Sequence, residues 1–116
     1  MKKLSKTQSE LLNNLISTIE VCKKYTNYED MFLNSKNEQN HLPTKDRCNC
    51  YYQTKESFSA ETWACYEEAF NDIKYKNTLI VYAKTETLKA LENHGDIIII
   101  EHAKYKGDAE LVKVIY

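Results

Sequence analysis

The segment Thr78–Tyr116 carries the pattern that most constrains how this chain of 116 residues can fold. A helix is predicted from about Thr85 and ends at Gly95, because glycine is the commonest residue to stop a helix. The apolar, β-branched run Ile97–Ile100 then favours a strand. After a short turn, residues 109–116 alternate in polarity and predict a second strand. We therefore expect a helix, a glycine stop and a β-hairpin, in that order.

Two earlier segments also have helical patterns. Ser5 and Gln8 fit a capping box, in which a hydroxyl and an amide three residues apart satisfy the first free backbone groups of a helix. Apolar residues recur at helical spacing after them, so a first helix is predicted over residues 6 to about 18. A short second helix is expected from Thr26 to before Lys36.

A third helix is predicted to open at Ser59. Its apolar residues recur on one face: Trp63, Tyr66, Phe70 and Ile73. Its acidic residues are expected to cover the opposite face: Glu61, Glu67, Glu68 and Asp72. The aromatic stripe should dock in the core, whereas the acidic face should repel phosphate. The run Leu79–Ala83 fits a strand or a helical turn, and Cys48–Gln53 fits a short strand.

The chain has the length and composition of one globular domain. Its net charge of −1 is unevenly distributed: residues 1–24 carry +3, residues 25–73 carry −5 and residues 74–116 carry +1. This pattern lacks the broad positive surface of a strong DNA binder, so any contacts to phosphate should be local.

The N-terminus and the apolar runs bear on the cellular compartment. Polar residues follow Met1, so no signal peptide is expected. Every apolar run is shorter than the roughly 20 residues that cross a membrane. We expect a cytoplasmic protein that does not bind membranes.

The helix from Thr85 is a candidate for reading DNA. Short polar and basic side chains at an exposed helix end suit the major groove, and this helix offers Thr85, Glu86, Lys89 and Asn93. Asn93 would face adenine, Glu86 cytosine, and Thr85 a phosphate or a thymine methyl group. The same residues are also typical of an ordinary solvated helix face.

The turn of the hairpin is a candidate for contacting the DNA backbone. It carries Lys104, Tyr105 and Lys106 beside Gly107. Two lysines there would straddle a phosphate backbone or a minor groove. A solvated hairpin tip has the same composition.

The four cysteines and His41 raise the question of a metal site. Zinc sites usually combine two pairs of ligands, but Cys48 and Cys50 form the one close pair in this sequence. We therefore expect free thiols, no metal and no cofactor, with Cys65 buried beside the aromatic stripe. The sequence also has no glycine-rich phosphate loop and no nucleophile elbow, so no enzyme is expected.

The run Thr87-Leu88-Lys89-Ala90-Leu91-Glu92-Asn93-His94-Gly95-Asp96-Ile97 resembles the T-L-x-x-L-E-x-x-G-x-I segment of winged helix-turn-helix proteins. These proteins are common among small regulators of Gram-positive bacteria, their phages and mobile elements. The resemblance implies an α+β winged-helix fold, with the helix from Thr85 in the major groove and the hairpin on the backbone. Asp96 departs from the pattern, which prefers an apolar residue there.

Two functions follow as expectations. The first is sequence-specific binding of duplex DNA in transcriptional regulation, in a dimer on a two-fold operator. The second is a phage or mobile-element protein that inhibits a host or defence protein. It would use the acidic surface of Glu61, Glu67, Glu68 and Asp72. In both cases we expect one winged-helix-like domain over residues 1–116 with an insert-like acidic middle at about 25–75.

Overall fold

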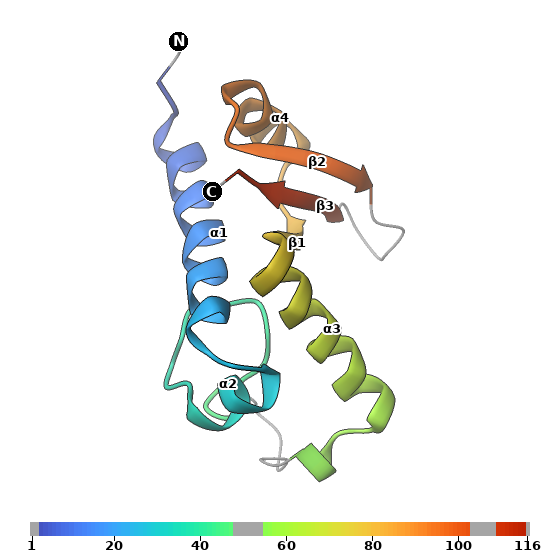
Figure 1. Ribbon diagram of the computed structural model, residues 1–116. Coiled ribbons are helices and arrows are strands. Elements are labelled where there is room, and N and C mark those ends of the chain that lie inside the picture. The colour runs from blue at the N-terminus through green and yellow to red at the C-terminus, as the bar shows by residue number, and fades with distance from the viewer. Residues whose placement is uncertain (1–2, 48–54, 103–108, 116) are drawn as a thin grey trace. The chain divides into compact units, whose positions relative to one another are not determined.

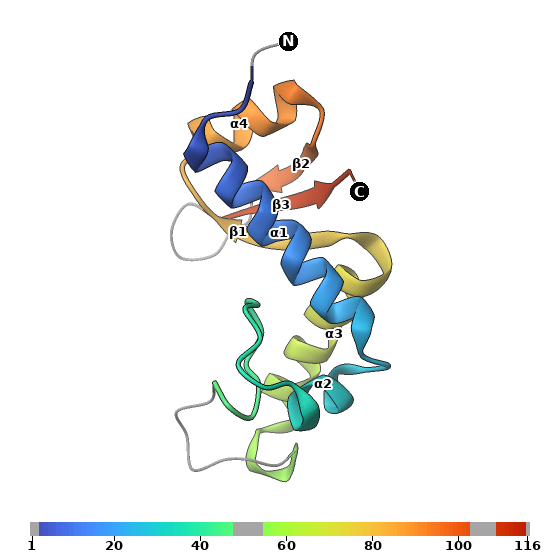
Figure 2. The ribbon, with the colours of Figure 1, turned by 90° about the vertical axis from the view of Figure 1, so that its left-hand side faces the viewer.

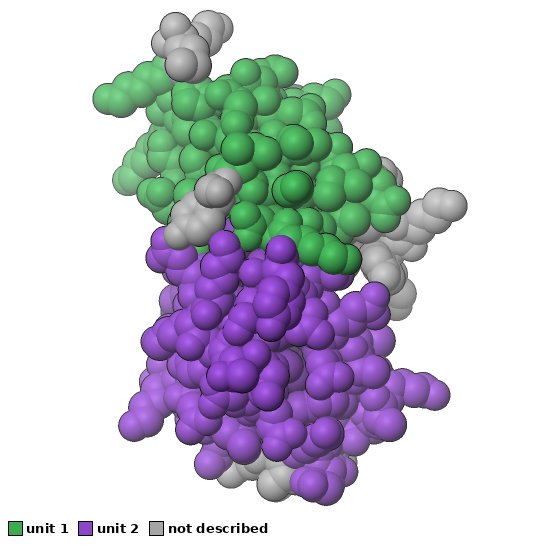
Figure 3. Space-filling view, in the orientation of Figure 1, with its two compact units in different colours: residues 1–16, 76–116 green, residues 17–75 purple. Residues whose placement is uncertain are grey.

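The computed structural model describes residues 3–47, 55–102 and 109–115. It shows an α+β protein whose chain divides into two compact units (Figure 3). Unit 1 combines residues 1–16 with residues 76–116, and unit 2 comprises the intervening residues 17–75. Along the sequence, unit 2 is therefore an insertion between the two segments of unit 1.

The described elements follow one another in the order labelled in Figure 1. They are α1 (Lys6–Lys24), α2 (Tyr28–Asn34), the 3-10 helix η1 (Lys55–Ser57), α3 (Ala60–Lys76), β1 (Thr78–Tyr82), α4 (Thr85–His94), β2 (Ile97–His102) and β3 (Ala109–Val114). None of the helices in the described ranges is long and apolar enough to cross a membrane.

Helix α1 begins at the capping box predicted from the sequence. The Ser5 N–H donates to Gln8 Oε1 at 2.9 Å, and the Gln8 N–H donates to Ser5 Oγ at 3.2 Å. The helix continues to Lys24, well past the expected end near residue 18. Ile19 and Cys22 are fully buried and extend its apolar stripe, so packing overrides the weak helix propensity of the β-branched residues there.

The core of unit 2 is aromatic. The expected stripe of α3 is buried at Trp63, Phe70 and Ile73. It packs against α2, where the Tyr28 and Trp63 ring centroids lie 4.7 Å apart. Phe32 meets the Trp63 ring nearly edge-on, with centroids 5.5 Å apart. Tilted and edge-on pairs are the favoured aromatic geometries, so this cluster stabilises unit 2 beyond the area it buries.

The polar segment after α2 is held against that helix by two hydrogen bonds. The Tyr28 hydroxyl donates to the Pro43 carbonyl oxygen at 2.9 Å. The Lys45 N–H donates to the Phe32 carbonyl oxygen at 3.0 Å. The Arg47 guanidinium donates to the Asn40 carbonyl oxygen, which closes the segment on itself.

The sheet of unit 1 is antiparallel, with strand order β1-β3-β2. Strands β2 and β3 form the predicted hairpin, and the run that fitted either a strand or a helical turn is strand β1. Because β3 lies in the centre, the chain from β1 passes through α4 and β2 before it returns to pair with β1. This pairing aligns Ile80 with Leu111.

Helix α4 covers one face of the hairpin, as both ribbon views show (Figures 1 and 2). Leu88 and Leu91 are fully buried on its inner side. The helix ends at Gly95, which adopts a left-handed conformation with φ 93°. The N–H groups of Gly95 and Asp96 then donate to the carbonyl oxygens of Glu92 and Leu91, each at 3.0 Å. These bonds satisfy the last free carbonyls of the helix.

Candidate nucleic-acid interface

The outward side of α4 brings together the four helix residues predicted to contact DNA. Thr85, Glu86, Lys89 and Asn93 are all exposed. Thr85, Lys89 and Asn93 follow one another at intervals of four, so each lies about 40° around the helix from the previous one. With Leu88 and Leu91 facing the sheet, these three side chains form a single polar row, which we call the α4 row.

The charges around the α4 row are mixed. Lys84 and Lys89 are exposed cations, and Glu86 and Glu92 are exposed acids. The carboxylate of Glu92 accepts a hydrogen bond of 2.9 Å from the Ile99 N–H, so it is engaged at the edge of β2. Among the described residues, the Glu86 carboxylate has no hydrogen bond or ion pair of this kind and is exposed to solvent.

Asp96, which lies between the end of α4 and the start of β2, has a structural partner in the last turn of α4. The Asp96 Oδ2 and His94 Nδ1 atoms lie 2.6 Å apart. The side chain of Asp96 is thus engaged with the end of α4. A histidine in the last turn also suits the negative end of the helix dipole.

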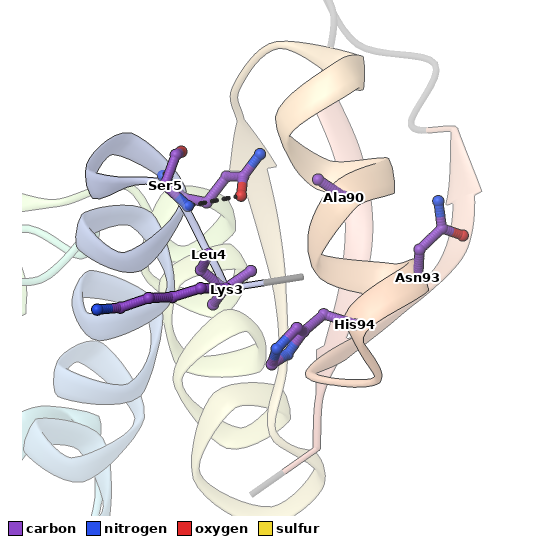
Figure 4. A pocket seen from close by; sticks show the side chains of 7 residues that line it. Lys3, Leu4, Ser5, Ala90, Asn93 and His94 are labelled. Carbon is purple, nitrogen blue, oxygen red and sulfur yellow. Dashed lines mark hydrogen bonds between the residues drawn. The ribbon is translucent and has the colours of Figure 1, made fainter. Parts of the chain in front are cut away.

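A shallow hollow lies between the start of α1 and the second half of α4 (Figure 4). Its lining includes Lys3, Leu4, Ser5, Gln8, Ala90, Asn93 and His94. The His94 ring turns toward the N-terminal segment, whereas the Asn93 amide points to the other side of α4. Ser5 and Gln8 are bonded to each other. Lys3 also lines the hollow, and its side chain extends away from α4 (Figure 4).

The hairpin residues predicted to contact the DNA backbone, Lys104, Tyr105 and Lys106, lie outside the described residues. The strands on either side are described as far as His102 and from Ala109 onward. Because β2 and β3 are antiparallel, His102 and Ala109 lie at the same end of the hairpin.

The acidic residues of α3 do not all share one face. Glu61 and Glu68 are exposed and lie seven residues apart, two turns along the same side of the helix. Asp72 continues that side and is half-buried. Glu67 lies about 100° away from Glu68 and lines a hollow beside Phe58 and Trp63.

Two of the four cysteines lie within the described ranges and both are free thiols. Cys22 is buried, and this burial raises the pKa of its thiol to about 12. Cys65 is exposed, so the prediction that it is buried was wrong. It lies two residues after Trp63, about 200° around the helix, and therefore faces away from the aromatic stripe.

The metal question concerns Cys48, Cys50 and His41. Among residues 3–47, 55–102 and 109–115, no three histidine, cysteine or acidic side chains are grouped closely enough to bind a metal ion. Cys48 and Cys50 lie outside these ranges. Burial and the nearby Arg47 guanidinium lower the pKa of His41.

Comparison with protein-family models, with curated proteins and with solved structures found no match.

Proposed function

We propose that unit 1 is a non-enzymatic, winged-helix-like module that binds duplex DNA and regulates transcription in the cytoplasm. The observation that carries this proposal is the exposed α4 row of Thr85, Lys89 and Asn93 on a helix that leads directly into a β-hairpin. An α-helix fits the major groove, which is about 12 Å wide. Helix followed by hairpin is also the order in which a winged-helix protein presents its reading helix and its wing.

Each residue of the proposed interface has a chemical role. Asn93 would bond the edge of adenine, and Glu86 would accept from the amino group of cytosine. Thr85 would contact a phosphate or a thymine methyl group, and Lys89 would bind guanine or a phosphate. The hairpin residues Lys104, Tyr105 and Lys106 would hold the DNA backbone. All of these residues belong to unit 1.

The distribution of charge supports assigning DNA to unit 1. By formal charge, unit 1 carries +2 and unit 2 carries −3. A surface of low positive charge makes few contacts to phosphate, so the affinity should depend on a small number of lysines. Such a protein would gain most of its specificity from the α4 row.

One feature of unit 1 differs from a helix-turn-helix. Residues 78–97 are all described, and α4 is the one helix between β1 and β2. A helix-turn-helix would place two helices there, the first of which supports the reading helix. In the proposed arrangement this support comes from the hairpin, against which Leu88 and Leu91 pack.

Selection from random duplex DNA at about 50 and 200 mM salt tests this proposal. Binding that enriches a sequence motif and weakens with salt supports it. Lys89→Glu should abolish the binding, whereas Lys36→Glu, an exposed lysine of unit 2, should retain it. Asn93→Ala should relax the motif at one position. If no duplex binds even at low salt, unit 1 is not a DNA-binding module.

A second function is supported by the exposed acids of α3. Glu61 and Glu68 project from one side of a regular helix in a unit of net charge −3. Such a surface suits a basic patch on another protein, as expected for a phage or mobile-element inhibitor of a host or defence protein. Reversal to Glu61→Lys and Glu68→Lys would abolish that inhibition, whereas Lys89→Glu would leave it intact.

A further inference from the structure

The sheet of unit 1 has an exposed face on the side away from α4. Along β1, Leu79 and Val81 are buried at 4% and 2%, whereas Ile80 and Tyr82 are exposed at 37% and 68%. This alternation is the two-residue period of a strand, so one face of the sheet meets the core and the other meets solvent. Apolar side chains therefore occupy the solvent side of β1.

The other two strands continue this apolar surface. On β2, Ile98 and Ile100 are exposed at 48% and 49%, whereas Ile97 is buried at 1%. On β3, Leu111 is half-buried and pairs directly with Ile80. The five residues Ile80, Tyr82, Ile98, Ile100 and Leu111 form what we call the outer apolar face.

The exposed apolar area of the outer apolar face is large for a surface in contact with solvent. Its apolar side chains expose on the order of 500 Å² in total, which is within the range of the largest patches on monomeric proteins, and these are often functional. A standard interface buries about 800 Å² on each partner. The outer apolar face and its polar rim are sufficient for an interface near the lower limit of that class.

The charges at the face favour a second copy of the same chain as the partner. Lys113 is exposed and pairs with Ile98 on the neighbouring strand. Glu101 is exposed and pairs with Leu111. The face thus carries one base and one acid. Two identical copies would present opposite charges to each other in equal number, and a two-fold contact uses the same patch on both subunits.

The edge of β2 is partly blocked against pairing with another strand. The Ile99 N–H points away from β3 and already donates to the Glu92 carboxylate at 2.9 Å. A strand added to this edge would have to displace that bond. Charged side chains at a strand edge are a common protection against such pairing.

We propose that two copies of this protein dimerise through the outer apolar face, with their sheets packed face to face. The proposal is independent of whether unit 1 binds DNA. Packed sheets lie about 10 Å apart, so the isoleucine side chains of the two copies would interdigitate in one layer.

Sedimentation equilibrium of the 116-residue chain and its variants tests this proposal. The wild-type protein should form a dimer at micromolar concentrations, and Ile98→Glu should shift it to a monomer by raising the dissociation constant at least tenfold. Leu33→Glu is the matched control, because Leu33 lies in unit 2 and is exposed at 47%, like Ile98 at 48%. This control should remain a dimer. Circular dichroism of each variant verifies that it is folded.

Exchanging the charges of Lys113 and Glu101 provides a second test of the proposed dimer. Lys113→Glu leaves two acids on each of two facing surfaces and should weaken the dimer. Adding Glu101→Lys restores one base and one acid per copy, so the double variant should dimerise again. A wild-type protein that is monomeric at all accessible concentrations overturns the proposal. A folded Ile98→Glu variant that dimerises as tightly as the wild type also overturns it.

Discussion

The carboxylate of Glu92 on α4 accepts a hydrogen bond of 2.9 Å from the Ile99 N–H on the free edge of β2. One side chain thus links the helix to the strand beside it and occupies a backbone donor that another strand would otherwise use. The bond reaches β2 one residue before the bulge between Ile99 and Glu101.

Removal of this bond should lower stability and expose the strand edge. Glu92→Ala should reduce the free energy of unfolding by about 1 kcal/mol. Glu92→Gln retains an acceptor oxygen and should reduce the free energy of unfolding by less than Glu92→Ala. Urea denaturation followed by circular dichroism measures both, with Lys89→Ala, an exposed change on the same helix, as the control. Equal stability of Glu92→Ala and the control would show that the bond contributes nothing.

The hydrogen bond from Tyr28 to Pro43 should stabilise unit 2. Tyr28→Phe removes the donor but keeps the ring, so it should cost about 1 kcal/mol. Tyr28→Ala also removes a fully buried ring and should cost about 3 to 5 kcal/mol. The fluorescence of Trp63, the one tryptophan of the chain, follows this unfolding in urea. Tyr75→Phe serves as the control, because Tyr75 is 68% exposed. A Tyr28→Phe variant as stable as this control would argue against the bond.

The capping box at the start of α1 should also be measurable. Ser5→Ala removes the acceptor for the Gln8 N–H and should cost about 1 kcal/mol in thermal or urea unfolding. Thr7→Ala lies in the same turn, is exposed and has no cap role, so it should change stability little. The prediction fails if both changes have the same effect.

The two described cysteines should differ strongly in reactivity. Thiolates are the reactive form, so the exposed Cys65 should react with iodoacetamide at pH 8 while Cys22 stays protected. Peptide mass spectrometry assigns the label to each site. Addition of urea should make Cys22 react as well, because unfolding removes the burial that raises its pKa to about 12. Rapid labelling of Cys22 in the folded protein would contradict its buried position.

The raised pKa of the Cys22 thiol predicts that the free energy of unfolding decreases at alkaline pH. The unfolded chain releases the Cys22 proton near pH 9, whereas the folded chain retains it to about pH 12. Stability from this group is therefore complete below pH 9 and decreases as the pH rises from 9 toward 12. Urea titrations at pH 8 and pH 10 should show this decrease, and it should be smaller in Cys22→Ala. An identical decrease in both proteins would assign it to other groups.

Local sequence patterns predicted the helix ends and helix faces that are determined by residues within one or a few turns. Ser5 and Gln8 cap α1 because the two groups lie in one turn, and Gly95 ends α4 because few other residues adopt its backbone conformation. The spacing of Trp63, Phe70 and Ile73 predicted the buried face of α3, because a helix repeats at a fixed angle.

Features that depend on contacts between residues far apart in the sequence could not be predicted from local patterns. Whether residues 79–83 form a strand is decided by pairing with β3, which begins at Ala109. The extension of α1 to Lys24 depends on burial of Ile19 and Cys22, which sequence propensity does not report. The burial of Cys65 was predicted wrongly because it lies only two residues after the buried Trp63, whereas its own angle on α3 points outward.

The candidate interface was predictable in part. Helical spacing placed Glu86, Lys89 and Asn93 on the exposed side once Leu88 and Leu91 had been assigned to the inner side. The use of Glu92 by the edge of β2 depends on tertiary packing. The same holds for Glu67, which lies apart from Glu61 and Glu68 near the aromatic cluster.

Gly95 shows what kind of sequence variation this fold should tolerate. Its φ of +93° suits glycine, yet a Cβ built there would meet no atom within 4 Å. The position therefore restricts the backbone conformation of its residue and does not restrict the size of the side chain. Every ordinary L-residue should cost a similar amount, roughly 1 kcal/mol, with asparagine the least costly because it tolerates left-handed backbone. A D-alanine introduced by chemical synthesis should avoid the cost altogether, and natural relatives of this chain should alternate between glycine and asparagine at this site.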